Sequence, residues 1–229
     1  MQLKILSWNI WIESRFDLVK SFLKDSNADI VGLQEVRADD PTRDTIGYMR
    51  SLGYEHVFSP IGKVWGSEVW NDGPAVFSKY PITSTETYTL SETNSRVAVR
   101  ADIQIAENVL HIFSTHLIHT HQQPSVVQEE QIENLIKVLP SERVIVMGDF
   151  NATPASRGVQ RMKSVLRDAD STDAPTWSVY PEGCKTCLPQ SVDTRLDYIF
   201  ASADIRTSDY RVGISKGSDH FPVSVIVEL

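Results

Sequence analysis

Short apolar segments recur along the whole chain, and they constrain its fold more than any other feature. Each is five to ten residues long, which is typical of β-strands and short for helices. Apolar residues alternate with polar ones in some segments and run continuously in others. We expect strands at residues 3–8, 30–34, 54–58, 74–78, 96–105, 109–115, 143–148, 196–201 and 221–227.

Helical spacing of apolar residues is less frequent than strand patterns. It predicts helices over residues 15–25, 41–51, 125–139 and 156–167. Ser14 and Ser156 stand just before the first and the last of these segments, and we expect both to act as N-caps. Pro140 ends the third segment, because proline cannot continue a helix.

The order of these elements indicates the fold class. Most strands follow one another as hairpins, and helices are inserted between some of them. This order favours an α+β fold in which two mainly antiparallel sheets pack face to face and helices cover their outer faces. No repeat or linker divides the chain, so we expect a single domain over residues 1–229. Residues 168–195 read as a long irregular loop, a type of segment that often carries function.

Composition and charge narrow the class of protein. The 229 residues are 41 % apolar and 23 % charged, which supports a buried core and argues against disorder. No apolar run could span a membrane, and the N-terminal MQLKILSWNI lacks the features of a signal peptide. We therefore expect a cytoplasmic protein, with a mature form whose leader was cut off as the alternative. The net charge of −8 and the absence of a Lys/Arg cluster disfavour tight binding of a nucleic-acid duplex. Bound divalent cations can, however, offset the negative charge of carboxylates in a binding site. No protein partner is indicated.

Polar residues occur at or beside the ends of six expected strands. Taken singly, each has an ordinary structural explanation, such as a solvated carboxylate or a turn. Together they would form a cluster of carboxylates, amides and imidazoles if those strand ends meet. The residues are Asn9, Glu35, His116, Asp149, Asn151, Asp197, Asp219 and His220.

Such a cluster has a definite chemistry. Oxygen ligands without cysteine suit a hard cation such as Mg²⁺ or Mn²⁺, and neighbouring carboxylates resist ionisation unless a cation lies between them. A divalent ion polarises a phosphate, imidazoles transfer protons near neutral pH, and amides stabilise developing charge. The set of residues therefore predicts metal-dependent hydrolysis of a phosphoester.

Six motifs, in this order along the chain, resemble those of the endonuclease/exonuclease/phosphatase superfamily. The resemblance implies a four-layer α/β/β/α sandwich and a deoxyribonuclease-like, metal-dependent phosphoesterase. Segments 75–82 and 96–103 also look like intervening strands of that superfamily. The motifs are SWN (7–9), LQEV (33–36), STHL (114–117), GDFN (148–151), RLDYIF (195–200) and SDHFPV (218–223).

The resemblance implies a role for each carboxylate and amide of the cluster. Glu35 would be the main ligand of the cation, Mg²⁺ or Mn²⁺, with Asn9 and Asp219 close to the ion or its waters. Asp149 would orient or deprotonate the attacking water. Asn151 would hold the scissile phosphate.

The resemblance also implies roles for the two imidazoles. His220 would contact the phosphate and transfer a proton, and Asp197 would fix its tautomer. His116 would be a second imidazole on the phosphate.

Arg96 is a further candidate for binding substrate. The alternative is an arginine that is simply exposed on the surface of a strand. Trp11 stands where several DNA-repair members carry an acidic residue, which weakens a repair assignment and places a bulky group near the substrate.

Two pairs of residues have no role in the resemblance. Cys184 and Cys187, in CKTC, could be reduced thiols, a small-loop disulfide or half of a metal site. His119 and His121 follow His116 at a spacing that invites a zinc site. We expect none there, because the segment looks like a loop and the superfamily uses only the first histidine.

The leading hypothesis is a divalent-metal-dependent hydrolase that cleaves a phosphoester, chiefly a phosphodiester, by in-line attack of an activated water. The expected substrate is a small phosphodiester or lipid head group. A DNA or RNA nuclease is the first alternative, and a catalytically silent binding module on the same scaffold is the second.

Overall fold

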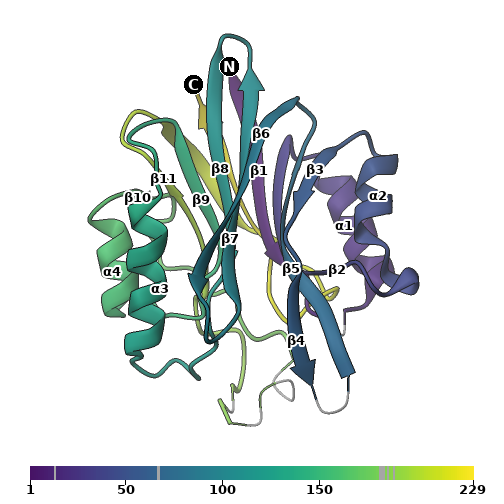
Figure 1. The fold of residues 1–229 in the computed structure, drawn as a ribbon, viewed down its shortest axis with the longest axis vertical. Helices are drawn as coiled ribbons and strands as arrows, with labels where there is room; N and C mark the ends of the chain where they lie inside the picture. The colour runs from purple at the N-terminus through teal and green to yellow at the C-terminus, as the bar shows by residue number, and fades with distance from the viewer. Residues whose placement is uncertain (13, 66–67, 181–183, 185, 188) are drawn as a thin grey trace.

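The computed structural model describes residues 1–12, 14–65, 68–180, 184, 186–187 and 189–229. Two β-sheets pack face to face, and helices cover the outer face of each sheet, as Figure 1 shows. This is the four-layer sandwich that the sequence predicts. Part of the expected loop 168–195 lies outside the described residues.

The first sheet has seven strands in the order β12-β13-β1-β2-β5-β3, with β4 paired to β5. Within it β1 and β2 are parallel, and the other described pairs are antiparallel. The strands are β1 (Gln2–Asn9), β2 (Ile30–Arg37), β3 (Glu55–Phe58), β4 (Ile61–Trp65), β5 (Glu68–Ser78), β12 (Arg206–Val212) and β13 (Val223–Glu228).

The second sheet has six strands in the order β10-β11-β9-β8-β7-β6. Here β8 and β9 are parallel, and the other described pairs are antiparallel. The strands are β6 (Ile82–Ser91), β7 (Arg96–Ile105), β8 (Asn108–His116), β9 (Val144–Asp149), β10 (Arg167–Asp168) and β11 (Asp197–Ala201).

Each parallel pair is joined by a helix that crosses over the sheet. Parallel neighbours need such a connection because the chain must return to its starting edge. Helix α1 (Phe16–Ser26) joins β1 to β2, and α3 (Val126–Lys137) joins β8 to β9. Helices α2 (Thr45–Ser51) and α4 (Arg157–Lys163) lie beside them on the respective outer faces (Figure 1).

The helix starts agree with the sequence analysis in part. The hydroxyl of Ser156 caps α4, as expected, by accepting a hydrogen bond from the Val159 amide at 3.3 Å. The expected cap at Ser14 is wrong, because Arg15 occupies the N-cap position of α1 and makes no side-chain capping bond.

The helix expected over 41–51 is interrupted. A 3₁₀ turn at Pro41–Arg43 comes first, and α2 starts after Asp44. The Asp44 carboxylate accepts a hydrogen bond from the Gly47 amide at 2.7 Å, so Asp44 caps a new helix and does not continue the preceding turn.

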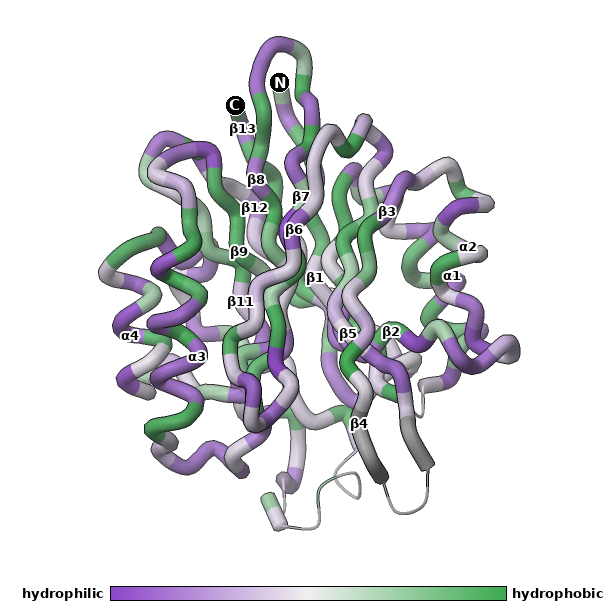
Figure 2. Tube along the Cα trace, in the orientation of Figure 1, coloured by the Kyte–Doolittle hydropathy of each residue, from purple (hydrophilic) through white to green (hydrophobic). Residues whose placement is uncertain are grey.

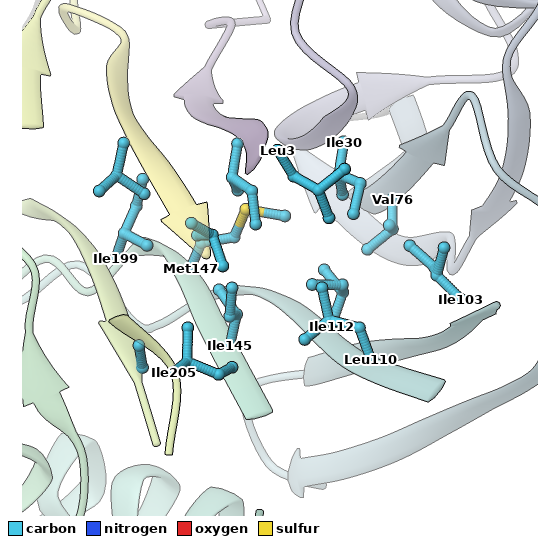
Figure 3. Packing of buried hydrophobic residues seen from close by; sticks show 14 of the residues in the cluster. Leu3, Ile30, Val76, Ile103, Leu110, Ile112, Ile145, Met147, Ile199 and Ile205 are labelled. Carbon is cyan, nitrogen blue, oxygen red and sulfur yellow. The ribbon is translucent and has the colours of Figure 1, made fainter. Parts of the chain in front are cut away.

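The main core lies between the sheets. Ile145 and Met147 of β9 face Leu3 of β1 and Ile30 of β2, as Figure 3 shows, and all four are fully buried. In Figure 2 the central strands are largely hydrophobic, whereas β6 is mostly pale or hydrophilic. The two remaining clusters fix α1 and α2 on one sheet and α3 and α4 on the other.

Gly32 lets the two sheets approach closely beneath the strand ends. A Cβ atom at Gly32 would lie 2.6 Å from Cε of Met147, a distance that side chains do not tolerate. The absence of a side chain at this β2 position therefore makes room for the Met147 side chain of the facing sheet.

Four of the described strands, β4, β6, β10 and β12, were missed by the sequence analysis, and β10 begins at Arg167, where the helix expected over 156–167 was to end. Strand β6 lies at one edge of its sheet and β12 at one edge of the other. Most residues of β6 and β12 are exposed or half-buried, so these strands show no continuous apolar pattern. Among the described helices, none has the length and apolar character needed to traverse a lipid bilayer.

Gly148, at the end of β9, is the position where we expect an added methyl group to be most harmful. Its φ is +150°, and a Cβ there would lie 2.0 Å from the carbonyl oxygen of Thr115. Gly148→Ala should lower the free energy of unfolding by about 3 kcal/mol, from backbone strain and overpacking together. Urea titration followed by circular dichroism measures this loss.

Gly62→Ala is the matched control. A Cβ at Gly62, an exposed position of β4, would meet only Oδ1 of Asn71 at 3.9 Å, so we expect a change within about 0.5 kcal/mol. Equal losses in the two variants would contradict the assigned role of Gly148.

Candidate active site

Strand ends from both sheets meet at one end of the sandwich. In the first sheet Asn9 is in register with Gln34, next to Glu35. In the second sheet Asp149 is in register with His116 on one side and with Asp197 on the other. Polar side chains from the two sheets therefore face each other at this end of the sandwich.

Asp149 is at the centre of this cluster and is 1 % exposed. Its Oδ2 accepts a hydrogen bond from Asn9 Nδ2 at 3.0 Å, and its Oδ1 accepts one from the Asn151 amide at 2.8 Å. The Nε2 atoms of His116 and His220 lie 3.5 and 3.6 Å from Oδ2. Burial raises the pKa of Asp149 to about 7, and the charge of His220 opposes that rise.

His220 is held by a buried chain of hydrogen bonds. Its Nδ1 lies 2.8 Å from Oδ2 of Asp197 and its Nε2 faces Asp149. Burial alone lowers the pKa of His220, but the carboxylates of Asp197, Asp149 and Asp219 hold it well above the usual value. Trp8 Nε1 donates to the His220 carbonyl at 2.9 Å and fixes the backbone.

Asn151 orients the second imidazole. Its Nδ2 donates to the Leu117 carbonyl at 3.1 Å, and this contact identifies Nδ2 as the nitrogen end of the amide. The same Nδ2 lies 3.0 Å from Nε2 of His116, which therefore accepts and carries no proton. The proton of His116 is then on Nδ1, 3.9 Å from Oε1 of Glu35.

Glu35 projects into the cluster because β2 is irregular there. The pairing of β2 with β5 shifts between Leu33 and Val36, and Glu35 has a φ of 60°. Its Oε2 accepts from the Ile12 amide at 2.8 Å and its Oε1 from Asn9 Nδ2 at 3.3 Å. These bonds fix the carboxylate at the end of the first sheet.

The donor set fits a divalent cation. Carboxylate and amide oxygens from Glu35, Asp219 and Asn9 are the atom types that hard cations prefer. Asp149, Asp197 and His220 also bring three potential ligand atoms within 4.8 Å of one another. Burial raises the pKa of Asp149 because it makes the ionised carboxylate costly, and a cation bound nearby would favour that ionised form.

The two expected substrate-binding residues lie beside the cluster. Arg96 Nη1 donates to the His116 carbonyl at 3.4 Å. Burial lowers its pKa, and the nearby carboxylates of Glu35 and Asp149 counteract that effect. Trp11 stacks on Tyr180 with ring centres 5.5 Å apart, and it lines a small cavity together with Glu35.

The segment before β11 supplies residues that the sequence analysis missed. Thr176 Oγ1 donates to Asp197 Oδ2 at 2.6 Å, and Trp177 Nε1 donates to Asp219 Oδ2 at 3.2 Å. Trp177 also forms an isolated β-bridge with His220. Their only signal in the sequence was the length of the expected loop.

Gln128 of α3 was missed as well. Its Nε2 lies 2.9 Å from the carbonyl of Ile118, 3.1 Å from that of Phe150 and 3.1 Å from that of Asn151. It joins the segments that carry His116 and Asn151. A glutamine at a helical position gave no sign of this contact.

Comparison with known proteins identifies the family. The sequence model of the Endonuclease/Exonuclease/phosphatase family matches residues 6–220. The chain therefore belongs to this family, as its motifs predict. No curated protein matched the chain.

Solved structures confirm the fold. A family member from Beutenbergia cavernae DSM 12333 superposes with a TM-score of 0.81 at 17 % identity, covering 100 % of this chain and 72 % of that one. A family protein from Leptotrichia buccalis C-1013-b gives 0.78 at 20 %, covering 99 % and 100 %. ANGEL2, described as a 2′,3′-cyclic phosphatase, gives 0.79 at 16 %, covering 99 % and 95 %.

Thr176 provides a test of how Asp197 is held. Its hydroxyl oxygen also accepts from the buried amides of Leu196 at 3.1 Å and Asp197 at 3.3 Å. Thr176→Val should lower the free energy of unfolding by about 2 kcal/mol, because these buried groups lose their partner. Thr176→Ser keeps the hydroxyl and should lose less than about 1 kcal/mol. Equal losses, measured by urea titration, would exclude the hydroxyl as the cause.

Proposed function

We propose that the chain is a divalent-metal-dependent hydrolase that cleaves phosphoesters, chiefly phosphodiesters, by in-line attack of water. The observation that carries this proposal is the convergence of His116 and His220 on the buried carboxylate of Asp149. Two imidazoles and a carboxylate with a pKa of about 7 are suited to proton transfer and phosphate binding near neutral pH. Because the cluster draws on residues 9 to 220, we propose that residues 1–229 act as a single domain.

In this proposal Asp149 accepts the proton of the attacking water. His116 and Asn151 hold the scissile phosphate. His220, kept protonated by Asp197 and Asp149, stabilises charge on the phosphate oxygens or donates a proton to the leaving group.

Glu35, Asn9 and Asp219 would hold the cation, Mg²⁺ or Mn²⁺. When bound, the cation supplies Lewis-acid polarisation of the phosphate. Arg96 adds a fixed positive charge beside the site, and Trp11 forms part of its rim.

A small phosphodiester is the proposed substrate class. A cavity of about 430 Å³ lies beside the cluster and shares only Asn151 with it; Gln128, Thr153 and Arg157 also line this cavity. We propose that a small organic group of the substrate occupies it while the phosphate lies in the cluster. The net charge of −8 weighs against a long polyanion. ANGEL2, one of the similar structures, is described as acting on a 2′,3′-cyclic phosphate, which is a small phosphodiester.

The first test is turnover of bis(p-nitrophenyl) phosphate with added Mg²⁺ or Mn²⁺. EDTA should abolish turnover and excess Mg²⁺ should restore it, because the cation is required for charge neutralisation. His220→Ala should lower kcat/KM by roughly 10²- to 10⁴-fold. His56→Ala is the control, since His56 stacks on Phe77 at the first sheet. A folded protein without metal-dependent turnover would instead support the silent binding module.

The pH dependence of kcat/KM tests the role of Asp149. A base with a raised pKa accepts a proton only above that pKa, and burial raises the pKa of Asp149 to about 7. A bound cation lowers it. The rate should therefore fall as the pH decreases, with a midpoint at or below about 7. A rate that increases from pH 8 to pH 5 would contradict this assignment.

Substrate classes can be separated on one preparation. Cleavage of nucleoside 2′,3′-cyclic phosphate, hydrolysis of sphingomyelin, release of phosphate from inositol phosphates and plasmid nicking should be compared at equal enzyme concentration. We expect the largest kcat/KM on a small phosphodiester or lipid head group. Preferential plasmid nicking would replace this proposal with the nuclease alternative.

A further inference from the structure

A second group of metal-binding side chains lies beside the catalytic cluster. His119 and His121 follow β8, and Cys184 and Cys187 belong to the segment before β11. Potential ligand atoms of these four residues all lie within 4.8 Å of one another. Residues 63 or more positions apart in the sequence meet here, which the spacing of the histidines alone did not predict.

The nitrogen–nitrogen and nitrogen–sulfur distances are close to those between ligands around one ion, whereas the two sulfurs are bonded to each other and would have to separate to about 3.8 Å. Nε2 of His119 and Nδ1 of His121 are 3.1 Å apart. The four nitrogen–sulfur distances are 3.4, 3.4, 3.7 and 3.9 Å. Tetrahedral zinc with two nitrogen and two sulfur ligands requires about 3.3 Å between nitrogens and about 3.6 Å between nitrogen and sulfur.

Hydrogen bonding prepares His119 as a ligand. The Asn151 amide is oriented by its bond to the Leu117 carbonyl, so its Oδ1 must be an acceptor. Nδ1 of His119 lies 2.8 Å from that Oδ1 and therefore carries the proton. Nε2 of His119 then presents a lone pair to Cys187, and metal-bound histidines typically donate their other N–H in this way.

We propose that these four residues form a Cys₂His₂ site for Zn²⁺, separate from the catalytic cation site. Thiolate and imidazole ligands favour zinc, whereas the oxygen-rich catalytic cluster favours Mg²⁺ or Mn²⁺. The structure contains Cys184 and Cys187 as a disulfide. Zinc binding requires its reduction: a dithiol donates two electrons and two protons, becomes a disulfide itself, and leaves two thiols. Zn²⁺ then displaces both protons.

The site would connect two segments of the active site. His119 is bonded to Asn151, and its ring lies 6.4 Å from that of Trp177, which binds Asp219. An ion held by all four ligands would join the segment after β8 to the segment before β11. It would also fix the amide that orients His116.

Metal content of the reduced 229-residue chain tests the proposal without reference to hydrolysis. Protein purified with a thiol reductant and exposed to Zn²⁺, then desalted, should retain about one zinc ion per chain by mass spectrometry of metals. Co²⁺ in its place should give thiolate-to-cobalt charge transfer and the visible bands of tetrahedral coordination. Excess Mg²⁺ should displace neither the bound Zn²⁺ nor the bound Co²⁺.

The variants separate this site from the catalytic one. Cys184→Ser with Cys187→Ser, and separately His121→Ala, should lower retained zinc roughly tenfold or more and abolish the cobalt signal. Thr186→Ser, an exposed change between the two cysteines, should retain the wild-type signals. Glu35→Gln should also retain them.

Two results would overturn the proposal. One is reduced wild-type protein, confirmed by thiol titration, that retains less than about a tenth of a zinc ion per chain and gives no charge-transfer band. The other is a double cysteine variant, folded by circular dichroism, that retains as much zinc as the wild type. Because no readout depends on turnover, failure of the proposed hydrolase function leaves this test intact.

Discussion

The close contact of the two sheets beneath the strand ends is the constraint on which the site depends. Gly32 of β2 makes room for Met147 of β9, so the strands that carry Glu35 and Asp149 approach each other. The parallel pairs β1–β2 and β8–β9 bring their carboxyl ends to this same level. Side chains from opposite sheets consequently share Asn9, which donates to both Glu35 and Asp149.

Burial gives this cluster its chemical character. A carboxylate as enclosed as Asp149 is costly to ionise, and the charge of His220 with the amide donors of Asn9 and Asn151 compensates for part of that cost. Asp197 and Thr176 in turn maintain the orientation of His220. The polar network is thus supported by hydrogen bonds that reach well beyond the residues facing the substrate.

The sequence predicted the strands that are buried in the core but missed strands at the edges of the sheets. Strand β7 was predicted with its observed limits, because its apolar pattern reflects packing on the core. Strands β6 and β12 were missed because edge strands bury too little to show a pattern. The main polar residues could be predicted because each lies at or beside the end of an apolar strand. Thr176, Gln128 and the meeting of His119 with Cys187 could not, since these contacts depend on how loops fold over the site.

The pairing of the first strand with the last has a consequence for synthesis of the chain. Strand β1 lies between β2 and β13, and Gln2 is in register with Glu228. A ribosome makes Asn9 and Glu35 long before His220, so a nascent chain leaves one side of β1 unpaired until β13 emerges. An apolar edge of that kind is prone to intermolecular pairing, which makes protection by chaperones most valuable late in translation.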